Sequence, residues 1–161
     1  MEGNKVKPRA LLVFGAPCSG KTTFAEKFAK RYKLTFYDFD SIREKSNYSQ
    51  KDILYILELI ARTGQNLIIE GCVGTYKERK EIIKILRKAG YGIKLVWIQT
   101  DLATIRMRLK ARYRNTAEAK RIYEEAVNKL EAPSDLEFPI ILSGKHTFDT
   151  QARHTLSGLA E

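Results

Sequence analysis

Hydrophobic residues occur along this chain in two patterns, short continuous runs and longer stripes with helical spacing. Residues 10–14 (ALLVF) form a continuous run, which is typical of a strand buried on both faces of a sheet. Residues 21–32 instead place Phe24, Phe28 and Tyr32 four positions apart, which predicts an amphipathic helix. Runs and stripes alternate along the sequence, and this alternation predicts a parallel sheet covered by helices.

The same two patterns divide the rest of the chain into elements. Further strands are predicted at residues 34–40, 67–70, 93–98 and 139–142. Further helices are predicted at residues 49–62, 77–89, 101–113, 117–130 and 150–159. Ser49, Asp101 and Thr116 are expected N-caps, because their side-chain oxygens can accept hydrogen bonds from first-turn amides. The predicted fold class is α/β, with three α/β/α layers around a five-stranded, mainly parallel sheet.

Composition narrows the class of protein without identifying it. The chain has 161 residues, so we expect one domain over residues 1–161. Two cysteines are too few for a disulfide framework, and no apolar run is long enough for a membrane-spanning helix. Because the first residues are polar rather than signal-like, we expect a cytoplasmic protein with no membrane partner. The net charge of +10 favours an anionic partner, although many small proteins are simply basic.

Residues 15–22 (GAPCSGKT) fit the phosphate-binding pattern G-x-x-x-x-G-K-[ST], between a predicted buried strand and a predicted helix. Glycines let backbone amides surround phosphate oxygens. Lys21 is expected to reach the β- and γ-phosphates and to act in catalysis, and Thr22 is expected to ligate Mg²⁺. The motif therefore predicts binding of ATP or GTP with Mg²⁺, and ATP with Mg²⁺ is the expected cofactor pair. The expected nucleotide contacts are Gly15, Ala16, Pro17, Cys18, Ser19, Gly20, Lys21, Thr22 and Thr23.

Acidic side chains are expected at the carboxyl end of the sheet, where parallel α/β folds bind ligands. Asp38 and Asp40 end the second predicted strand two residues apart, which would place both on one face. Asp40 is a candidate general base toward an attacking hydroxyl, and Asp38 is a candidate Mg²⁺ ligand or acceptor contact. Arg43 follows three residues later and is a candidate contact to an anion on the same acceptor. Turn chemistry is the alternative explanation, because Asp and Ser are common at strand exits.

Glu70 ends the third predicted strand directly after a buried run. An acid at such a position is costly to bury unless it has a partner. Its candidate partners are Mg²⁺ with its water ligands, Lys21 and the acceptor substrate. Glu70 is therefore a candidate substrate-binding residue.

The predicted helix at residues 101–113 carries a basic cluster. Arg108 and Arg112 lie one turn apart on one flank of its apolar stripe, and guanidinium groups suit phosphoryl oxygens. Both are candidate catalytic residues, and Arg112 is also a candidate nucleotide contact. They belong to a short helical lid expected at about residues 106–131. A solvated basic face is a sufficient explanation for Lys110.

The P-loop, residues 40–43, residues 69–71 and residues 108–112 occur in an order that resembles the adenylate-kinase-like small-molecule kinases. The nearest resemblance is to the polynucleotide-kinase-like group of AAA-type ATPases, with zeta toxins as near relatives. It extends from residue 10 to about residue 144. The chain departs from nucleoside monophosphate kinases, because no Asp-Gly-Phe-Pro-Arg stretch follows the third strand.

This resemblance implies roles for individual residues. In the group, the Asp of D-x-x-R acts as a base and the Arg contacts an acceptor phosphate, which implies these roles for Asp40 and Arg43. In zeta toxins a Glu-Gly after the third strand engages the acceptor sugar, whereas in adenylate kinases an Asp-Gly at that point serves Mg²⁺. The implied role of Glu70 is therefore divided between the two.

The expected function is that of an ATP-dependent kinase that moves the γ-phosphate to a hydroxyl of a small or nucleotide-like acceptor. The acceptor is left open between a nucleotide, an oligonucleotide 5′ end and a phosphorylated sugar. One alternative is a nucleic-acid-associated P-loop NTPase without a phosphoacceptor, which the basic balance permits. A second is a nucleotide-binding regulatory protein with weak turnover. A candidate base together with a lid favours phosphoryl transfer.

Overall fold

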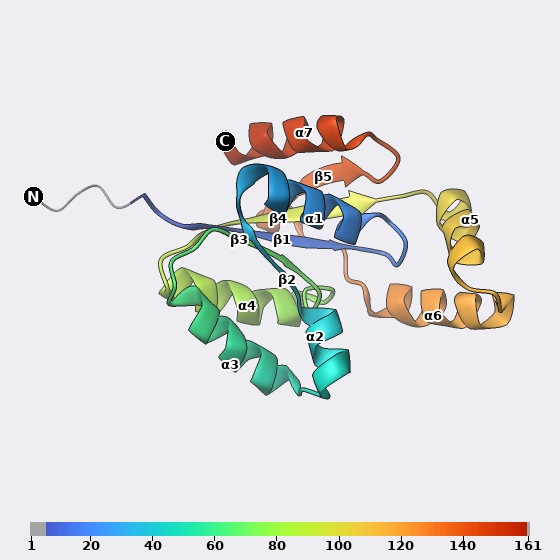
Figure 1. The fold of residues 1–161 in the computed structure, drawn as a ribbon, viewed down its shortest axis with the longest axis horizontal. Helices are drawn as coiled ribbons and strands as arrows, with labels where there is room; N and C mark the ends of the chain where they lie inside the picture. Colours follow the sequence, from blue (N-terminus) through green and yellow to red (C-terminus); the bar gives the residue numbers. More distant parts are fainter. Residues whose placement is uncertain (1–5, 161) are drawn as a thin grey trace, which may run out of the picture.

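Five parallel strands form the centre of the molecule in this computed structural model, which describes residues 6–160 (Figure 1). The strands are β1 (Arg9–Gly15), β2 (Thr35–Asp38), β3 (Leu67–Glu70), β4 (Gly92–Gln99) and β5 (Ile140–Ser143). Their order across the sheet is β2-β3-β1-β4-β5, and β1 lies at the centre with Leu12 beside Ile69 and Leu95. Each of the four strand pairings is parallel, so the prediction of a five-stranded parallel sheet is confirmed.

Helices cover both faces of the sheet and extend beyond one end of it. The helices are α1 (Lys21–Tyr32), α2 (Phe39–Ser46), α3 (Gln50–Ala61), α4 (Tyr76–Lys88), α5 (Leu102–Arg112), α6 (Thr116–Lys129) and α7 (Phe148–Ala160), with a 3-10 turn η1 (Asp135–Glu137). Figure 1 shows α1 and α7 above the sheet, α3 and α4 below it, and α5 and α6 beyond the carboxyl ends of the strands. The predicted three-layer α/β/α arrangement is therefore confirmed.

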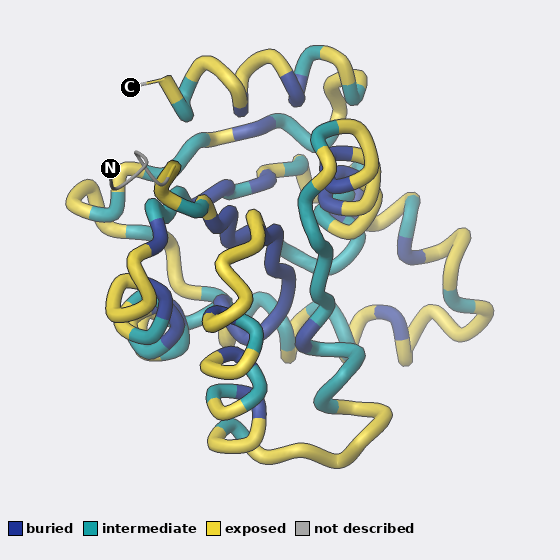
Figure 2. The backbone as a smooth tube through the Cα atoms, turned by 60° about the vertical axis from the view of Figure 1, so that its left-hand side comes forward, coloured by how far each residue is buried: buried dark blue, intermediate teal, exposed yellow. Residues whose placement is uncertain are grey.

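The central strand β1 supplies both halves of the core, because alternate strand residues point to opposite faces. Leu11 and Val13 pack in a cluster with Phe24 and Phe28 of α1. Leu12 belongs to the cluster on the opposite face, which also contains the inward residues of α3 and α4. Figure 2 shows continuous buried stretches at the centre of the molecule, and burial is continuous over residues 10–15 of β1 and over all of β3. Each such side chain contributes about 1.5–3 kcal/mol when it is fully buried.

The second strand is shorter than the sequence predicts. Strand β2 ends at Asp38, and α2 begins at the next residue. Asp38 is the N-cap of α2, with its side chain accepting from the Ser41 amide, so local hydrogen bonding ends the strand. The prediction that Asp38 and Asp40 share one strand face is therefore wrong, because Asp40 lies in the first turn of α2.

The helix caps show where short-range patterns succeed and fail. Ser49 and Asp101 cap α3 and α5 as predicted. Thr116 does not cap α6, because the Asn115 side chain accepts from the amides of residues 117 and 118 and makes Thr116 the first helical residue. Between α6 and β5, residues 135–137 form the 3-10 turn η1.

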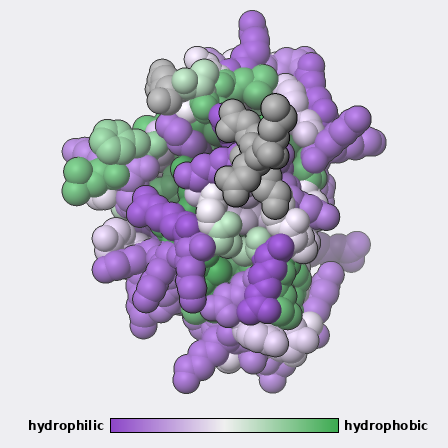
Figure 3. All heavy atoms as spheres, turned by 90° about the vertical axis from the view of Figure 1, so that its left-hand side faces the viewer, coloured by the Kyte–Doolittle hydropathy of each residue, from purple (hydrophilic) through white to green (hydrophobic). Residues whose placement is uncertain are grey.

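The amino ends of the strands lie opposite α5 and α6. Figure 3 shows this end of the molecule, where hydrophilic side chains dominate and hydrophobic areas are small and scattered. None of the helices within residues 6–160 has the length and apolar character needed to cross a membrane.

Candidate active site

The P-loop connects β1 to α1 and is held by hydrogen bonds to its carbonyl groups. Arg108 Nη1 donates to the Cys18 carbonyl at 3.0 Å, and Thr100 Oγ1 donates to the Ser19 carbonyl at 2.9 Å. Gly144 lies so close that a Cβ there would collide with the Ser19 carbonyl. With the carbonyls engaged in this way, the free amides at the start of α1 remain for a phosphate.

Two cavities open beside this loop. The first, which we call the P-loop cavity, has a volume of about 570 Å³, within the range of small-molecule sites. It lies between the P-loop, α5 and the loop that follows β5. Its lining includes Pro17, Cys18, Gly20, Lys21, Thr22, Thr23, Asp38, Asp40, Glu70, Arg108, Arg112, Tyr113, Gly144 and His146.

The second cavity, which we call the α6 cavity, has a volume of about 440 Å³. It lies between α2, the loop at residues 71–75 and the inner side of α6. Its lining includes Phe14, Pro17, Lys21, Asp40, Arg43, Glu44, Cys72, Val73, Gly74, Arg121, Glu125, Lys129 and Leu130. Pro17, Lys21 and Asp40 line both cavities, so the two meet at an ammonium and a carboxylate.

Glu70 is directed at the P-loop from the neighbouring strand. Its Oε1 accepts a hydrogen bond from Thr22 Oγ1 at 2.7 Å and lies 3.9 Å from Lys21 Nζ. Only 4% of the residue is exposed, and burial raises its pKa despite the opposing effects of Thr22 and Lys21. The second oxygen, Oε2, is buried without a hydrogen-bond partner. A buried, unpaired carboxylate oxygen beside a P-loop threonine fits a magnesium site with retained water ligands.

Asp40 is oriented by the turn that follows β3. Its Oδ1 accepts the Cys72 amide at 3.1 Å and lies 3.6 Å from Arg43 Nη2. Gly71 has a φ of 84°, and a Cβ at this residue would collide with the Asp40 backbone nitrogen. Glycine is therefore required for this close approach. Oδ2 has no hydrogen-bond partner among residues 6–160.

Asp38 lines the P-loop cavity, but both of its oxygens are engaged within α2. Oδ1 accepts the Ser41 amide at 3.0 Å, and Oδ2 accepts the Ser41 hydroxyl at 2.7 Å. This arrangement accounts for Asp38 as a helix cap, whereas the carboxylate that contacts Thr22 and keeps one buried oxygen without a partner is that of Glu70.

The two lid arginines occupy different environments. Arg108 is half-buried and donates to the carbonyls of Cys18 and Gly144, each at 3.0 Å, so it braces the P-loop. Arg112 is exposed at the end of α5, lines the P-loop cavity and lies over the ring of Tyr113. Lys110 is exposed and outside both cavities, as a solvated basic face requires.

Sequence reasoning did not find the residues of the α6 cavity that lie beyond Arg43. Arg121 and Lys129 line the cavity from α6, and Arg79 lies fully buried behind it. A signal for Arg79 was present, because it continues the inward stripe of α4 that contains Ile82 and Leu86. No group of three or more His, Cys, Asp or Glu residues in the described part of the chain is arranged to hold a metal ion.

Known structures share this arrangement of strands and helices. A gluconokinase from Sinorhizobium meliloti 1021 superimposes with a TM-score of 0.73 at 17% identity, covering 95% of this chain and 92% of that one. The Mycobacterium tuberculosis APS kinase in complex with AMPPNP and APS gives a TM-score of 0.68 at 18% identity, with 96% and 99% covered. A shikimate kinase from Aquifex aeolicus gives 0.53 at 17%, with 94% and 96% covered. At these identities the likeness shows the fold.

Comparison of sequences places the chain in a family. No curated protein sequence gives a significant match. The family model AAA_33, described as an AAA domain, matches residues 11–135, a segment that contains the P-loop, Asp40, Glu70 and both lid arginines. The chain therefore belongs to the AAA_33 family of AAA domains.

Proposed function

We propose that this protein is an ATP-dependent kinase that transfers the γ-phosphoryl group to a hydroxyl of a small anionic acceptor. One observation carries the proposal. Lys21 and Asp40 both line the P-loop cavity and the α6 cavity, so a charge stabiliser and a base lie where two ligands would meet. Structures described as gluconokinase, APS kinase and shikimate kinase share the fold and support transfer to a small molecule.

In this proposal the P-loop cavity binds ATP. Amides at the start of α1 bind the phosphates, Lys21 stabilises charge on the transferred group, and Arg112 contacts the nucleotide. Thr22 and Glu70 are the residues that would hold magnesium, which would neutralise phosphate charge when bound. Arg108 keeps the P-loop in shape through the Cys18 carbonyl.

The α6 cavity binds the acceptor. The free Oδ2 of Asp40 takes the proton of the acceptor hydroxyl. The hydroxyl oxygen of the acceptor bonds to the γ-phosphorus at the same time, and the bond between that phosphorus and the leaving oxygen of ADP breaks. The Cys72 amide and Arg43 hold the other oxygen of Asp40, which fixes the direction of its free lone pairs. Asp38 positions α2, and therefore Asp40, by capping the helix.

The lining of the α6 cavity favours an anionic acceptor without a base. Arg43, Arg121 and Lys129 supply positive charge, but Asp40, Glu44, Glu78 and Glu125 line the same cavity. Arg121 pairs with Glu125 at 2.9 Å and Arg43 lies 3.6 Å from Asp40, so of these three the positive charge without an ion pair among residues 6–160 is that of Lys129. Among residues 6–160, Phe14 is the one aromatic side chain that lines it, and it is 2% exposed, so these residues offer no ring face for stacking. A phosphorylated sugar or a hydroxy acid fits this lining better than the nucleotide or oligonucleotide that the net charge of +10 also favours.

The experiment is a transfer assay with γ-labelled ATP and Mg²⁺. The panel contains D-gluconate, shikimate, ribose 5-phosphate and a 5′-hydroxyl oligonucleotide. Each compound is tested with the native protein and, as the control, with the Asp40→Asn variant. Label in a sugar or hydroxy acid, lost with Asp40→Asn, supports the proposal. Label in the oligonucleotide alone, with binding that falls steeply between 50 and 200 mM salt, would instead support a polynucleotide kinase. ATP hydrolysis that responds to none of the four and persists in Asp40→Asn would support an NTPase.

A further inference from the structure

A fully buried arginine lies behind the α6 cavity. Arg79 is 0% exposed, and its guanidinium lies 5.0 Å from the ring centre of Phe14. Its Nε and Nη2 donate to the two carboxylate oxygens of Glu137 at 2.8 and 3.3 Å, which is a bidentate ion pair. Burial alone would raise the pKa of Glu137, but Arg79 and the Ser134 amide lower it overall.

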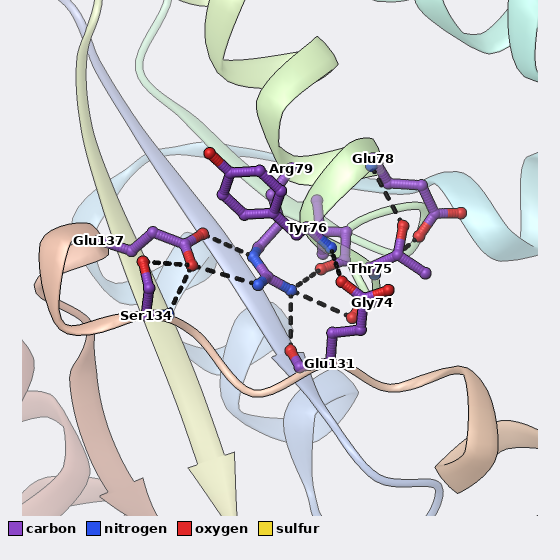
Figure 4. Close-up of polar contacts among 9 residues, drawn as sticks. Gly74, Thr75, Tyr76, Glu78, Arg79, Glu131, Ser134 and Glu137 are labelled. Atoms are coloured by element: carbon purple, nitrogen blue, oxygen red, sulfur yellow. Dashed lines mark hydrogen bonds and ion pairs between the residues drawn. The ribbon is translucent and has the colours of Figure 1, made fainter.

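The remaining donors of Arg79 reach backbone carbonyls on two other segments. Its Nη1 lies 3.3 Å from the Val73 carbonyl, 3.1 Å from that of Gly74 and 3.0 Å from that of Glu131. Figure 4 shows the guanidinium between the start of α4 and the segment that follows α6.

Two of these segments, the loop at residues 71–75 and the end of α6, also line the α6 cavity, together with Phe14 of β1. Phe14 is part of its floor, Val73 and Gly74 are one wall, and α6 up to Leu130 is the opposite wall. Two further hydrogen bonds join the walls, since the Glu131 amide donates to the Gly74 carbonyl at 2.9 Å and the Glu131 carboxylate accepts the Tyr76 amide at 2.8 Å.

Burying an arginine at this position costs free energy that an apolar residue would not cost, if packing is the only requirement. The charge must be removed from water, and apolar residues often replace buried ion pairs without loss of stability. The start of α4 is fixed independently by the Thr75–Glu78 capping box, and Ile82 and Leu86 bury its inward face. What an apolar side chain could not do is hold three backbone carbonyls from two irregular segments at one point.

We propose that Arg79 is a positioning residue for the acceptor: it holds the loop at residues 71–75 and the end of α6 at a fixed separation, so that the α6 cavity keeps its shape. The proposal rests on the proposed function for the identity of the acceptor site. Arg79 touches no substrate and acts through the carbonyls of Val73, Gly74 and Glu131.

The chain contains a reporter for this role that does not need kinase activity. Cys72 is only 3% exposed in the wall loop, so a reagent reaches its thiol slowly while the loop is held. Cys18 lies in the P-loop, away from Arg79, and is half-buried. Labelling by N-ethylmaleimide, read for each cysteine by peptide mass spectrometry, therefore compares the two cavities within one molecule.

The variants are Arg79→Lys and Glu137→Gln, the second being the milder one that keeps Arg79 in place. Ile82→Val is the matched control, because it loosens the buried face of α4 without touching the network. We expect Glu137→Gln to speed Cys72 labelling about tenfold and Arg79→Lys to speed it more. Cys18 labelling should change less than twofold, with protection by AMPPNP retained. With an acceptor found in the transfer panel, KM for that acceptor should rise at least fivefold while KM for ATP changes less than twofold.

Three results would overturn the proposal. The first is unchanged Cys72 labelling in folded Glu137→Gln protein. The second is an equal rise at Cys18 and Cys72, which would mean global loosening. The third is a selective rise in Cys72 labelling in the Ile82→Val control, when its melting temperature has fallen by as much as that of Glu137→Gln. A failure of the transfer panel would leave the labelling result intact and would count against the proposed function alone.

Discussion

The two cavities share a border but are built in different ways. One stretch, residues 17–24, supplies more of the P-loop cavity lining than any other segment. The end of α5, residues 144–151 and the acidic residues near the ends of β2 and β3 complete it. The α6 cavity is assembled from α2, the loop at residues 71–75 and α6, which are far apart in the sequence. Phosphate binding needs amides in one local geometry, which a short motif can encode. A cavity for a particular acceptor can be built from distant segments, and it then needs ties such as Arg79 to hold them together.

The largest effect is expected at the border between the cavities. Asp40→Asn removes the base but keeps the size and most hydrogen bonds of the side chain. Transfer to an acceptor should fall about 10³-fold, within the range for a general base, while the Kd for an ATP analogue changes little. Rapid-quench transfer and analogue titration measure the two quantities. Undiminished transfer would remove Asp40 from the mechanism and leave Asp38 or Glu70 as the base.

Lys21→Ala should produce the next largest loss of turnover. Here the loss comes from the P-loop cavity, where Lys21 acts on ATP. We expect turnover to fall by about two orders of magnitude, which is about 2.7 kcal/mol of transition-state stabilisation. The melting temperature should stay close to that of the native protein, because Lys21 makes only a 3.4 Å contact to the Ala16 carbonyl and a long pair with Glu70. Near-normal turnover would contradict the assignment of the P-loop cavity to ATP.

Glu70→Gln should separate stability from activity. The Mg²⁺ concentration for half-maximal turnover should rise about 10- to 100-fold, as when a partner of a bound metal is lost. Without nucleotide, the variant should melt at a higher temperature at pH 7, because burial raises the pKa of Glu70 in the folded state.

The pH dependence of that difference has a defined sign. A raised pKa means that the stability contributed by Glu70 is complete below its ordinary pKa of about 4.3 and is lost as pH rises through the folded value. The melting curves of Glu70→Gln and native protein should therefore converge in acid. A variant that melts lower at pH 7, with unchanged Mg²⁺ demand, would make Glu70 a structural partner of Thr22.

The smallest effect is expected at the outer rim of the P-loop cavity. Arg112→Ala should weaken ATP binding about three- to tenfold, because an exposed charge contributes about 1 kcal/mol. The melting temperature without nucleotide should be unchanged. Lys110→Ala on the same helix is the matched control and should have no effect. Equal losses from the two variants would assign the effect to bulk charge.

The division between the cavities also explains what the sequence could predict. The alternation of strands and helices in a parallel α/β fold and the place of Lys21 and Thr22 follow from periodicity and from one local motif. The sequence identifies Asp40 as a candidate base but does not predict its position. The aromatic pattern extends the predicted strand past Asp38, whereas α2 begins directly after that residue. The hydrogen-bonding preference of Asp-x-x-Ser for a helix start outweighed the aromatic strand pattern.

Long-range contacts account for the rest. Arg108 was expected at the phosphates, yet its nitrogens donate to carbonyls of residues 18 and 144, a pairing that no local pattern encodes. The role of Arg79 could not be predicted, because a single arginine on an apolar stripe does not indicate which backbone carbonyls its guanidinium binds. The end of α6 is joined to the loop after β3 by a similar long-range contact, the hydrogen bond from the Glu131 amide to the Gly74 carbonyl.

The close contact of Gly144 with the P-loop has a consequence for the time course of nucleotide binding. Because the loop after β5 presses on Ser19 and leaves no room for a side chain, the P-loop has its shape before any phosphate arrives. Association should then be a single step, with an observed rate that increases linearly with nucleotide concentration. Gly144→Ala should convert this line into a curve that reaches a plateau, because the displaced loop would have to rearrange before or after each encounter. Stopped-flow measurements with a fluorescent ATP analogue would distinguish the two shapes.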